Sequence, residues 1–103
     1  MAAWLAVASV DDFAASDAVA VDVGGTEVAV FLVDGNVYAT ANRCTHGDAS
    51  LCEGFLEGHQ IECPFHQGRF DVRSGVATAA PAEVALATWA ARLVDGRVEL
   101  LVG

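Results

Sequence analysis

All three cysteines and all three histidines of this 103-residue chain lie within residues 44–68. Two tight pairs stand out, Cys44-Thr45-His46 and, after a long spacer, Cys63-Pro64-Phe65-His66. Each pair presents one thiol and one imidazole, and both groups are ligands for transition metals. The spacing therefore predicts a metal centre held between two short loops. Coincidence and a cysteine–histidine nucleophile are the weaker interpretations.

Two kinds of metal centre suit a set of two cysteines and two histidines. Zinc binds such a set tetrahedrally, but its usual spacings pair cysteine with cysteine and histidine with histidine. Here each loop supplies one of each. The interleaving favours a [2Fe–2S] centre of the Rieske type, in which both cysteines hold one iron and both histidines hold the other. The alternative is a zinc-stabilised binding module without a redox role.

Charge and hydropathy limit the class of protein. Fourteen acidic residues against five basic ones give a net charge of −9, which disfavours binding to nucleic acid. The longest charge-free run, residues 1–10, is shorter than the roughly 18 apolar residues of a membrane-spanning helix and has no basic residue typical of a signal peptide. We therefore expect a cytoplasmic monomer that binds no membrane. Its acidity serves solubility or steers it towards a basic partner.

Short runs of β-branched and aromatic residues, separated by turn residues, predict an all-β domain. Gly24-Gly25, Asp34-Gly35 and Asp95-Gly96 each separate two such runs, as expected for hairpins. A helical turn is expected within residues 9–16, with Ser9 as its cap. The expected strands are residues 19–23, 26–33, 36–40, 87–94 and 97–102.

Residues 42–81 lie between the two groups of expected strands and consist of short glycine-containing loops. We expect this segment to have only a small core, so that a metal fixes its loops. Gly47 and Gly68 are expected to allow positive φ values and to direct backbone N–H groups at an anionic centre. Pro64 is expected to stiffen the second loop.

The motifs C-T-H-G and E-C-P-F-H-Q-G-R-F-D resemble the cluster-binding motifs of Rieske-type ferredoxins from bacterial aromatic-ring-hydroxylating dioxygenase systems. The resemblance covers almost the whole chain. It implies one Rieske-type [2Fe–2S] cluster, with Cys44 and Cys63 on the buried iron and His46 and His66 on the outer iron.

The same resemblance implies a single Rieske domain over residues 1–103. Its base is an antiparallel β-sandwich, about residues 1–41 and 82–103, and a small cluster-binding subdomain covers about residues 42–81. A proline-containing loop at Ala80-Pro81 is expected to cover the cluster.

The function implied by the resemblance is electron transfer and not catalysis. The protein would carry one electron from a flavoprotein, NADH-dependent ferredoxin reductase to a Rieske non-haem iron oxygenase in aromatic hydrocarbon catabolism. The sequence has no glycine-rich dinucleotide fingerprint, because Gly24-Gly25 belongs to a hairpin. An integral subunit of a larger redox enzyme is a less favoured interpretation.

The remaining candidate residues are expected to have structural roles. Cys52 is predicted to pack as a small apolar residue, and His59 to be exposed in a hairpin turn. Trp4 and Trp89 are predicted to pack in the core or at a sheet edge. The acidic residues that could add charge around the partner-binding face are Asp48, Glu53, Glu57 and Glu62.

The second motif also predicts a low reduction potential. Respiratory Rieske proteins have an extra cysteine in each loop, together with a serine and a tyrosine in the second. This chain has Phe65, Gly68 and Phe70 at the corresponding second-loop positions. Hydroxyl donors stabilise a reduced cluster, so their absence places the potential near the lower end of the roughly −150 to +300 mV span of Rieske centres.

Overall fold

A computed structural model describes residues 2–45, 49–65 and 67–103 of the chain. Within these residues, every strand belongs to one of three antiparallel sheets, and the helical segments are two short 3-10 turns, η1 (Val10–Phe13) and η2 (Leu51–Glu53). The all-β class predicted from the sequence is confirmed. In this part of the chain, no helix has the length and apolar character needed to span a bilayer.

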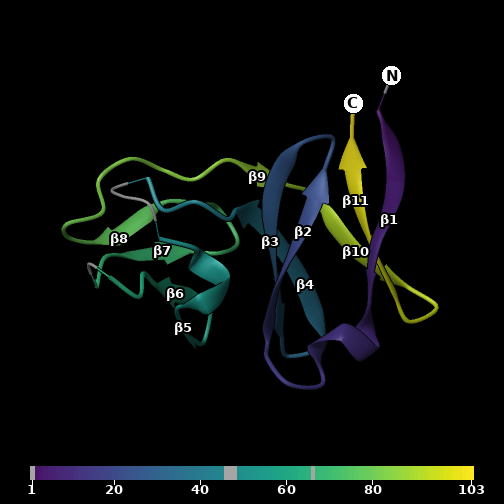
Figure 1. Ribbon diagram of the computed structural model, residues 1–103, viewed down its shortest axis with the longest axis horizontal. Helices are drawn as coiled ribbons and strands as arrows, with labels where there is room; N and C mark the ends of the chain where they lie inside the picture. The colour runs from purple at the N-terminus through teal and green to yellow at the C-terminus, as the bar shows by residue number, and fades with distance from the viewer. Residues whose placement is uncertain (1, 46–48, 66) are drawn as a thin grey trace.

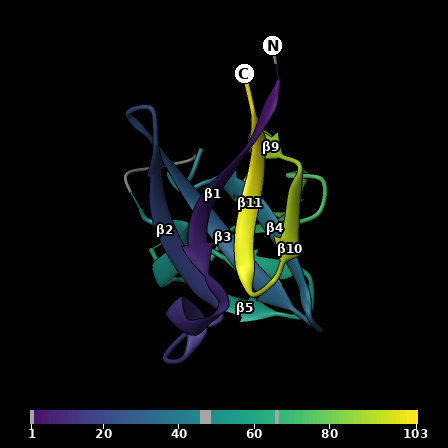
Figure 2. The ribbon, with the colours of Figure 1, turned by 90° about the vertical axis from the view of Figure 1, so that its right-hand side faces the viewer.

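The three sheets lie side by side along the longest axis of the molecule (Figure 1). The first has the strand order β1-β11-β10, the second β2-β3-β4-β9 and the third β5-β6-β7-β8. Figure 2 shows the first sheet in front, with the third behind the second. The strands are β1 Ala3–Ser9, β2 Ala18–Val23, β3 Thr26–Val33, β4 Asn36–Ala41, β5 Phe55–Glu57, β6 Gln60–Glu62, β7 Arg69–Asp71, β8 Ala77–Ala79, β9 Thr88–Trp89, β10 Ala91–Val94 and β11 Arg97–Val102.

The predicted hairpins form at the predicted turns. In each of the turns β2–β3, β3–β4 and β10–β11, both central residues have positive φ, as the twist of a two-residue hairpin requires. Ser9 caps η1 as expected: its hydroxyl accepts from the Asp11 N–H at 3.2 Å, and the Asp12 carboxylate accepts from the Ser9 N–H at 2.9 Å.

Two predictions about strands need correction. Residues 87–94 do not form one strand: β9 pairs with β4, β10 pairs with β11, and Ala90 separates them. A period-two pattern cannot show where a strand changes its sheet. Residues 42–81 are also not only loops, because β5 to β8 form a sheet of their own.

Two apolar cores fill the spaces between the sheets. The base core lies between the first and second sheets, and the loop-side core lies between the second and third. The base core contains Phe13, Val28, Val30, Val37, Ala39, Val98 and Leu100. The loop-side core contains Ala29, Phe31, Cys44, Ala49, Leu51, Ile61, Cys63, Phe70, Val72, Ala82 and Leu86. Strand β3 contributes alternate residues to both, so it is the wall that they share.

Candidate metal centre

The first predicted ligand, Cys44, follows β4 after a two-residue link. Its backbone N–H donates a hydrogen bond to the Ala49 carbonyl at 2.9 Å, and Arg43 forms a β-bridge with Ser50. Cys44 is 3% exposed and belongs to the loop-side core. The backbone pairing therefore turns Cys44 inward at the start of the first cysteine loop, which we define as residues 42–52.

The second predicted ligand, Cys63, follows β6 directly and is fully buried. Its N–H donates to the Gly68 carbonyl at 2.8 Å, and its own carbonyl accepts from the Gln67 N–H at 3.1 Å. These two bonds close the second cysteine loop, residues 63–68. The positive φ expected at Gly68 is instead found at Gln67, where φ is 60°.

Gly68 is required for a different reason from the one predicted. A Cβ added to it would lie 2.9 Å from the Cβ of Ala82, closer than side-chain atoms pack. Ala82 is itself buried in the loop-side core. The absence of a side chain at position 68 therefore lets the segment after Pro81 lie against the second cysteine loop.

Both predicted cysteine ligands lie in one apolar core, although they come from different loops. The same core contains the buried side chains of Leu51, Ile61 and Phe70. Thiolates supplied from two loops to a dry, apolar site fit the cysteine half of a Rieske centre. The predicted histidine ligands, His46 and His66, lie outside the described residues, as do Gly47 and Asp48.

Residues 80–86, which include Ala80-Pro81, contact both cysteine loops through Ala82 and Val84, and we call this segment the covering loop. The hydroxyl of Thr45 donates to the Val84 carbonyl at 2.7 Å. At the end of the covering loop, the Leu86 N–H donates to the Gly75 carbonyl at 2.8 Å. Ala82 and Leu86 are buried in the loop-side core. The covering loop is thus fixed by both hydrogen bonds and apolar packing.

The residues assigned structural roles mostly have them. Cys52 is partly buried against the loop-side core, and burial, together with the nearby Glu53, raises the pKa of its thiol. Trp89 packs against the base core, while the Trp4 ring lies 4.0 Å below the guanidinium of Arg92. The prediction for His59 is only partly right. It follows Gly58 in the β5–β6 turn but is half-buried, with its ring edge-on to that of Tyr38.

Of the acidic residues expected near the partner-binding face, Asp48 lies outside the described residues and Glu57 lies on β5 of the third sheet. Glu53 is on η2, which packs beside β2 and β3 of the second sheet. The Glu62 carboxylate pairs with Arg69 at 3.1 Å. Exposed apolar side chains occur near the loops instead: Phe65 is 71% exposed and Val84 is 64% exposed.

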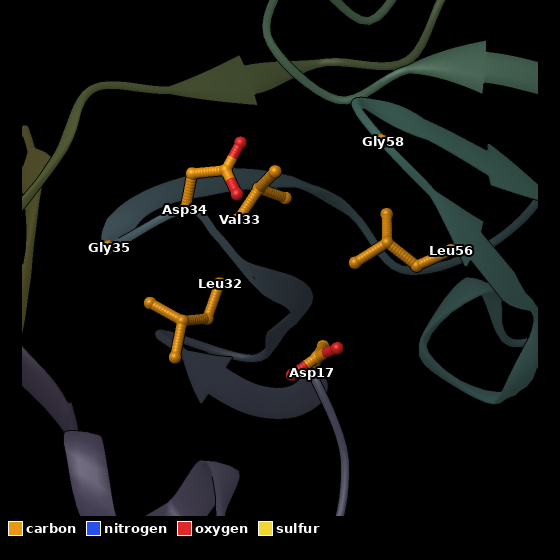
Figure 3. A pocket seen from close by; sticks show the side chains of 7 residues that line it. All are labelled: Asp17, Leu32, Val33, Asp34, Gly35, Leu56 and Gly58. Carbon is orange, nitrogen blue, oxygen red and sulfur yellow. The ribbon is translucent and has the colours of Figure 1, made fainter.

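A groove of about 350 Å³ lies away from the cysteine loops, between the β3–β4 turn and the β5–β6 hairpin (Figure 3). Leu56 and Gly58 lie across it from Leu32 and Asp34. Its lining contains carboxylates and apolar groups but, among the described residues, no cysteine or histidine. It is therefore not part of the candidate metal centre.

Residues 3–90 match the family described as the Rieske [2Fe-2S] domain. The chain belongs to the Rieske family. As a Rieske protein it carries one [2Fe–2S] cluster, which decides between the two metals that the ligand spacing allowed. The expectation of a Rieske fold is likewise confirmed.

Individual relatives narrow the comparison within the Rieske family. The ferredoxin component of the naphthalene 1,2-dioxygenase/salicylate 5-hydroxylase systems of a Ralstonia species is 46% identical over 97 residues, covering 94% of this chain and 93% of that protein. Sphingomonas yanoikuyae B1 ferredoxin superposes with a TM-score of 0.89 at 37% identity, covering 98% of this chain and 100% of that one. A chain in the solved complex of reduced oxygenase and oxidized ferredoxin in carbazole 1,9a-dioxygenase has a TM-score of 0.85 at 40% identity, with coverages of 94% and 91%. The predicted likeness to Rieske-type ferredoxins of dioxygenase systems is confirmed.

Proposed function

We propose that this Rieske protein is a monomeric one-electron carrier between a flavoprotein ferredoxin reductase that uses NADH and the Rieske non-haem iron oxygenase of an aromatic-ring dioxygenase system. The observation that carries the proposal is the burial of Cys44 and Cys63 in one core beneath the covering loop, in a chain similar to dioxygenase ferredoxins. When bound, a Rieske cluster accepts and releases one electron at a time. NADH is a cytoplasmic reductant, so we place this electron transfer in the cytoplasm.

The proposed ligands are Cys44 and Cys63 for one iron and His46 and His66 for the other. The burial of both cysteines supports their assignment to the inner iron, because thiolates in an apolar core are shielded from water and from partners. We further propose that residues 42–81 act as the cluster-binding subdomain on a base of residues 1–41 and 82–103. The separate sheet β5-β6-β7-β8 supports this division.

Docking is proposed to use the exposed apolar residues around the cysteine loops. Phe65 immediately precedes His66 in sequence, and Val84 lies on the covering loop that Thr45 holds. Because both side chains are more than half exposed, a partner can bury them without rearranging the core. The net charge of −9 steers the encounter, while these apolar groups supply the contact.

The direct test uses the purified holoprotein, NADH and a flavoprotein reductase from a related dioxygenase system. The protein should be coloured, and its visible absorbance should bleach upon reduction and recover when a matching oxygenase turns over an aromatic substrate. The rate of reduction should fall as the ionic strength rises. A colourless protein that contains zinc, or a reduced protein that passes no electron to any oxygenase, would overturn the proposal.

A pair of phenylalanine variants tests the docking surface. Phe65→Ser should slow electron transfer to the oxygenase by about tenfold, the effect of losing ~1.4 kcal/mol of contact energy. Phe55→Ser is the matched control, because Phe55 is 66% exposed but lies on β5, outside both cysteine loops and the covering loop. Equal rates for the two variants would show that Phe65 has no special role in docking.

A further inference from the structure

Asn42 is a buried polar residue between the end of β4 and Cys44. It is 1% exposed and is bordered by the apolar loop-side core. Leaving a buried amide without partners is costly, so the bonds that it makes indicate what it is for. The sequence alone did not single it out, since asparagine before a loop is common in turns.

The hydrogen bonds of Asn42 connect two parts of the molecule. Towards β3, its backbone N–H donates to the Glu27 carbonyl at 3.1 Å, and its side-chain Nδ2 donates to the Glu27 carboxylate. Towards η2, its Oδ1 accepts from the Cys52 N–H at 2.9 Å, and its carbonyl accepts from the Leu51 N–H at 2.7 Å. A single side chain therefore links the second sheet to the far end of the first cysteine loop.

The pairing continues from Asn42 towards Cys44. Arg43 bridges Ser50, and the Cys44 N–H reaches the Ala49 carbonyl, so residues 42–44 run antiparallel to residues 49–52. Asn42 is at the foot of this short ladder, where it joins β3. If Asn42 shifted relative to β3, the backbone pairs that follow it would shift as well, and Cys44 would move with them.

We propose that Asn42 is a positioning residue for Cys44, which transmits the position of β3 through Glu27 to the first cysteine loop. The inference rests on the proposed function of Cys44 as a cluster ligand. An amide suits this role because it offers a donor and an acceptor at once, whereas a carboxylate offers only acceptors. Glu27 is exposed, so its carboxylate can exchange the amide for water, but the buried Asn42 cannot.

Exchanging the amide of Asn42 and the carboxylate of Glu27 tests the inference. The rate of cluster loss to a chelator is followed in the holoprotein by visible absorbance, and the reduced cluster is recorded by electron paramagnetic resonance. Asn42→Asp should speed cluster loss by about tenfold (~1.4 kcal/mol) and broaden the resonance, because two carboxylates then face each other. Glu27→Gln should stay within about twofold of the unsubstituted protein, since its amide oxygen still accepts from Asn42.

The double variant Asn42→Asp with Glu27→Gln reverses the donor and the acceptor. Its glutamine amide can donate to the aspartate, and we expect the rate to return to within about threefold of the unsubstituted value with a sharp resonance. A double variant that loses its cluster as fast as Asn42→Asp alone would overturn the inference. So would an Asn42→Asp protein with unchanged rate and resonance.

Val98→Ala separates positioning from general stability. Val98 is fully buried in the base core, so this variant should unfold at a lower temperature while its rate of cluster loss and its resonance stay unchanged at 25 °C. If Val98→Ala loosened the cluster as much as Asn42→Asp, the role of Asn42 would be merely structural. A colourless protein that contains zinc would overturn the proposed function and not the role of Asn42. The same variants would then be compared by their rates of zinc release. Failure of the proposed function and failure of the Asn42 inference are therefore distinguishable.

Discussion

The hydroxyl of Thr45 donates a hydrogen bond to the backbone carbonyl of Val84 over 2.7 Å, across 39 residues of sequence. This bond joins the first cysteine loop to the covering loop. Because the carbonyl belongs to the backbone, the bond fixes the course of the covering loop irrespective of which side chain stands at position 84.

Thr45→Val keeps the side-chain volume but removes the donor. The free energy of unfolding should fall by roughly 0.5–1.5 kcal/mol, and the cluster should be lost faster to a chelator. Thr78→Val is the matched control, because Thr78 donates at 3.0 Å to Gln60 on the third sheet and not to the covering loop. Faster cluster loss in both variants would show that the Thr45 bond has no specific effect on the covering loop.

Serine variants of the cysteines test the proposed ligands. Cys44→Ser and Cys63→Ser should each prevent assembly of the cluster, whereas Cys52→Ser should retain the full visible spectrum. Cys52 is the internal control, since it is only partly buried at the edge of the same core. Retention of colour in Cys44→Ser, or its loss in Cys52→Ser, would contradict the assignment.

Phe70→Tyr tests the prediction of a low reduction potential. Phe70 is fully buried in the loop-side core that also contains both cysteines, and a hydroxyl there should raise the potential measured by voltammetry if it donates to the cluster or to a cysteine sulfur. Phe31→Tyr is the control, because Phe31 is equally buried in the same core but lies on β3.

The structure favours Phe70→Tyr over Gly68→Ser for this experiment. A serine at position 68 would collide with Ala82, so a changed potential could not be attributed to its hydroxyl. A potential well above zero in the unsubstituted protein would contradict the prediction, even though the cluster assignment would stand.

Gly75 and Gly35 form a matched pair for the close approach of the covering loop. Their φ values are 80° and 81°, so an alanine at either position has a similar backbone cost of roughly 1–2 kcal/mol. At Gly75 the added Cβ would also overlap the Leu86 carbonyl, whereas at Gly35 it would meet nothing within 4 Å. Gly75→Ala should therefore lower the free energy of unfolding clearly more than Gly35→Ala in a denaturant titration. Equal losses of unfolding free energy in the two variants would show that the covering loop can shift away from the added Cβ at little cost.

Acid should remove the contribution of Asp71 to stability. The hydrogen bond from the Arg73 guanidinium is the main cause that lowers the pKa of Asp71 from 3.8 to about 2. A carboxyl with a lowered pKa in the folded state stabilises the fold above its unfolded pKa and loses this effect as the pH falls. Because Arg73 is exposed, solvent screens its attraction to Asp71 and keeps the contribution small. Relative to Asp71→Asn, the unsubstituted protein should be more stable by about 1 kcal/mol at pH 7. The difference should shrink between about pH 4 and pH 2 in parallel melts, and a constant difference would contradict it.

The sequence was most informative where a single local rule determines the structure. The interleaved cysteines and histidines pointed to a Rieske centre, and Gly24-Gly25 and Asp95-Gly96 marked hairpins because few other residues adopt positive φ at both central positions. It was least informative for strands β5 to β8, each only three residues long and thus too short to show an alternating pattern.

Contacts between distant residues were also beyond local reasoning. Nothing in the sequence near Gly68 reveals that Ala82 packs against it, and the positive φ at Gln67 breaks the rule that favours glycine. The hydrogen bonds of Asn42 to Glu27 and Cys52 likewise depend on the tertiary arrangement. An asparagine two residues before a predicted ligand was the available signal, but many loops contain one.

Successive side chains of β3 face different cores, and this alternation restricts how the cluster site could be transplanted into another protein. Val28 and Val30 face the base core, while Ala29 and Phe31 face the same core as Cys44 and Cys63. A graft of residues 42–86 alone would lack Ala29 and Phe31. The apolar side chains of the loop-side core that pack against β3 would then be exposed to water. The smallest portable unit is therefore those residues together with a host strand that presents equivalent side chains in the same register, since a slip by one residue would exchange the two faces.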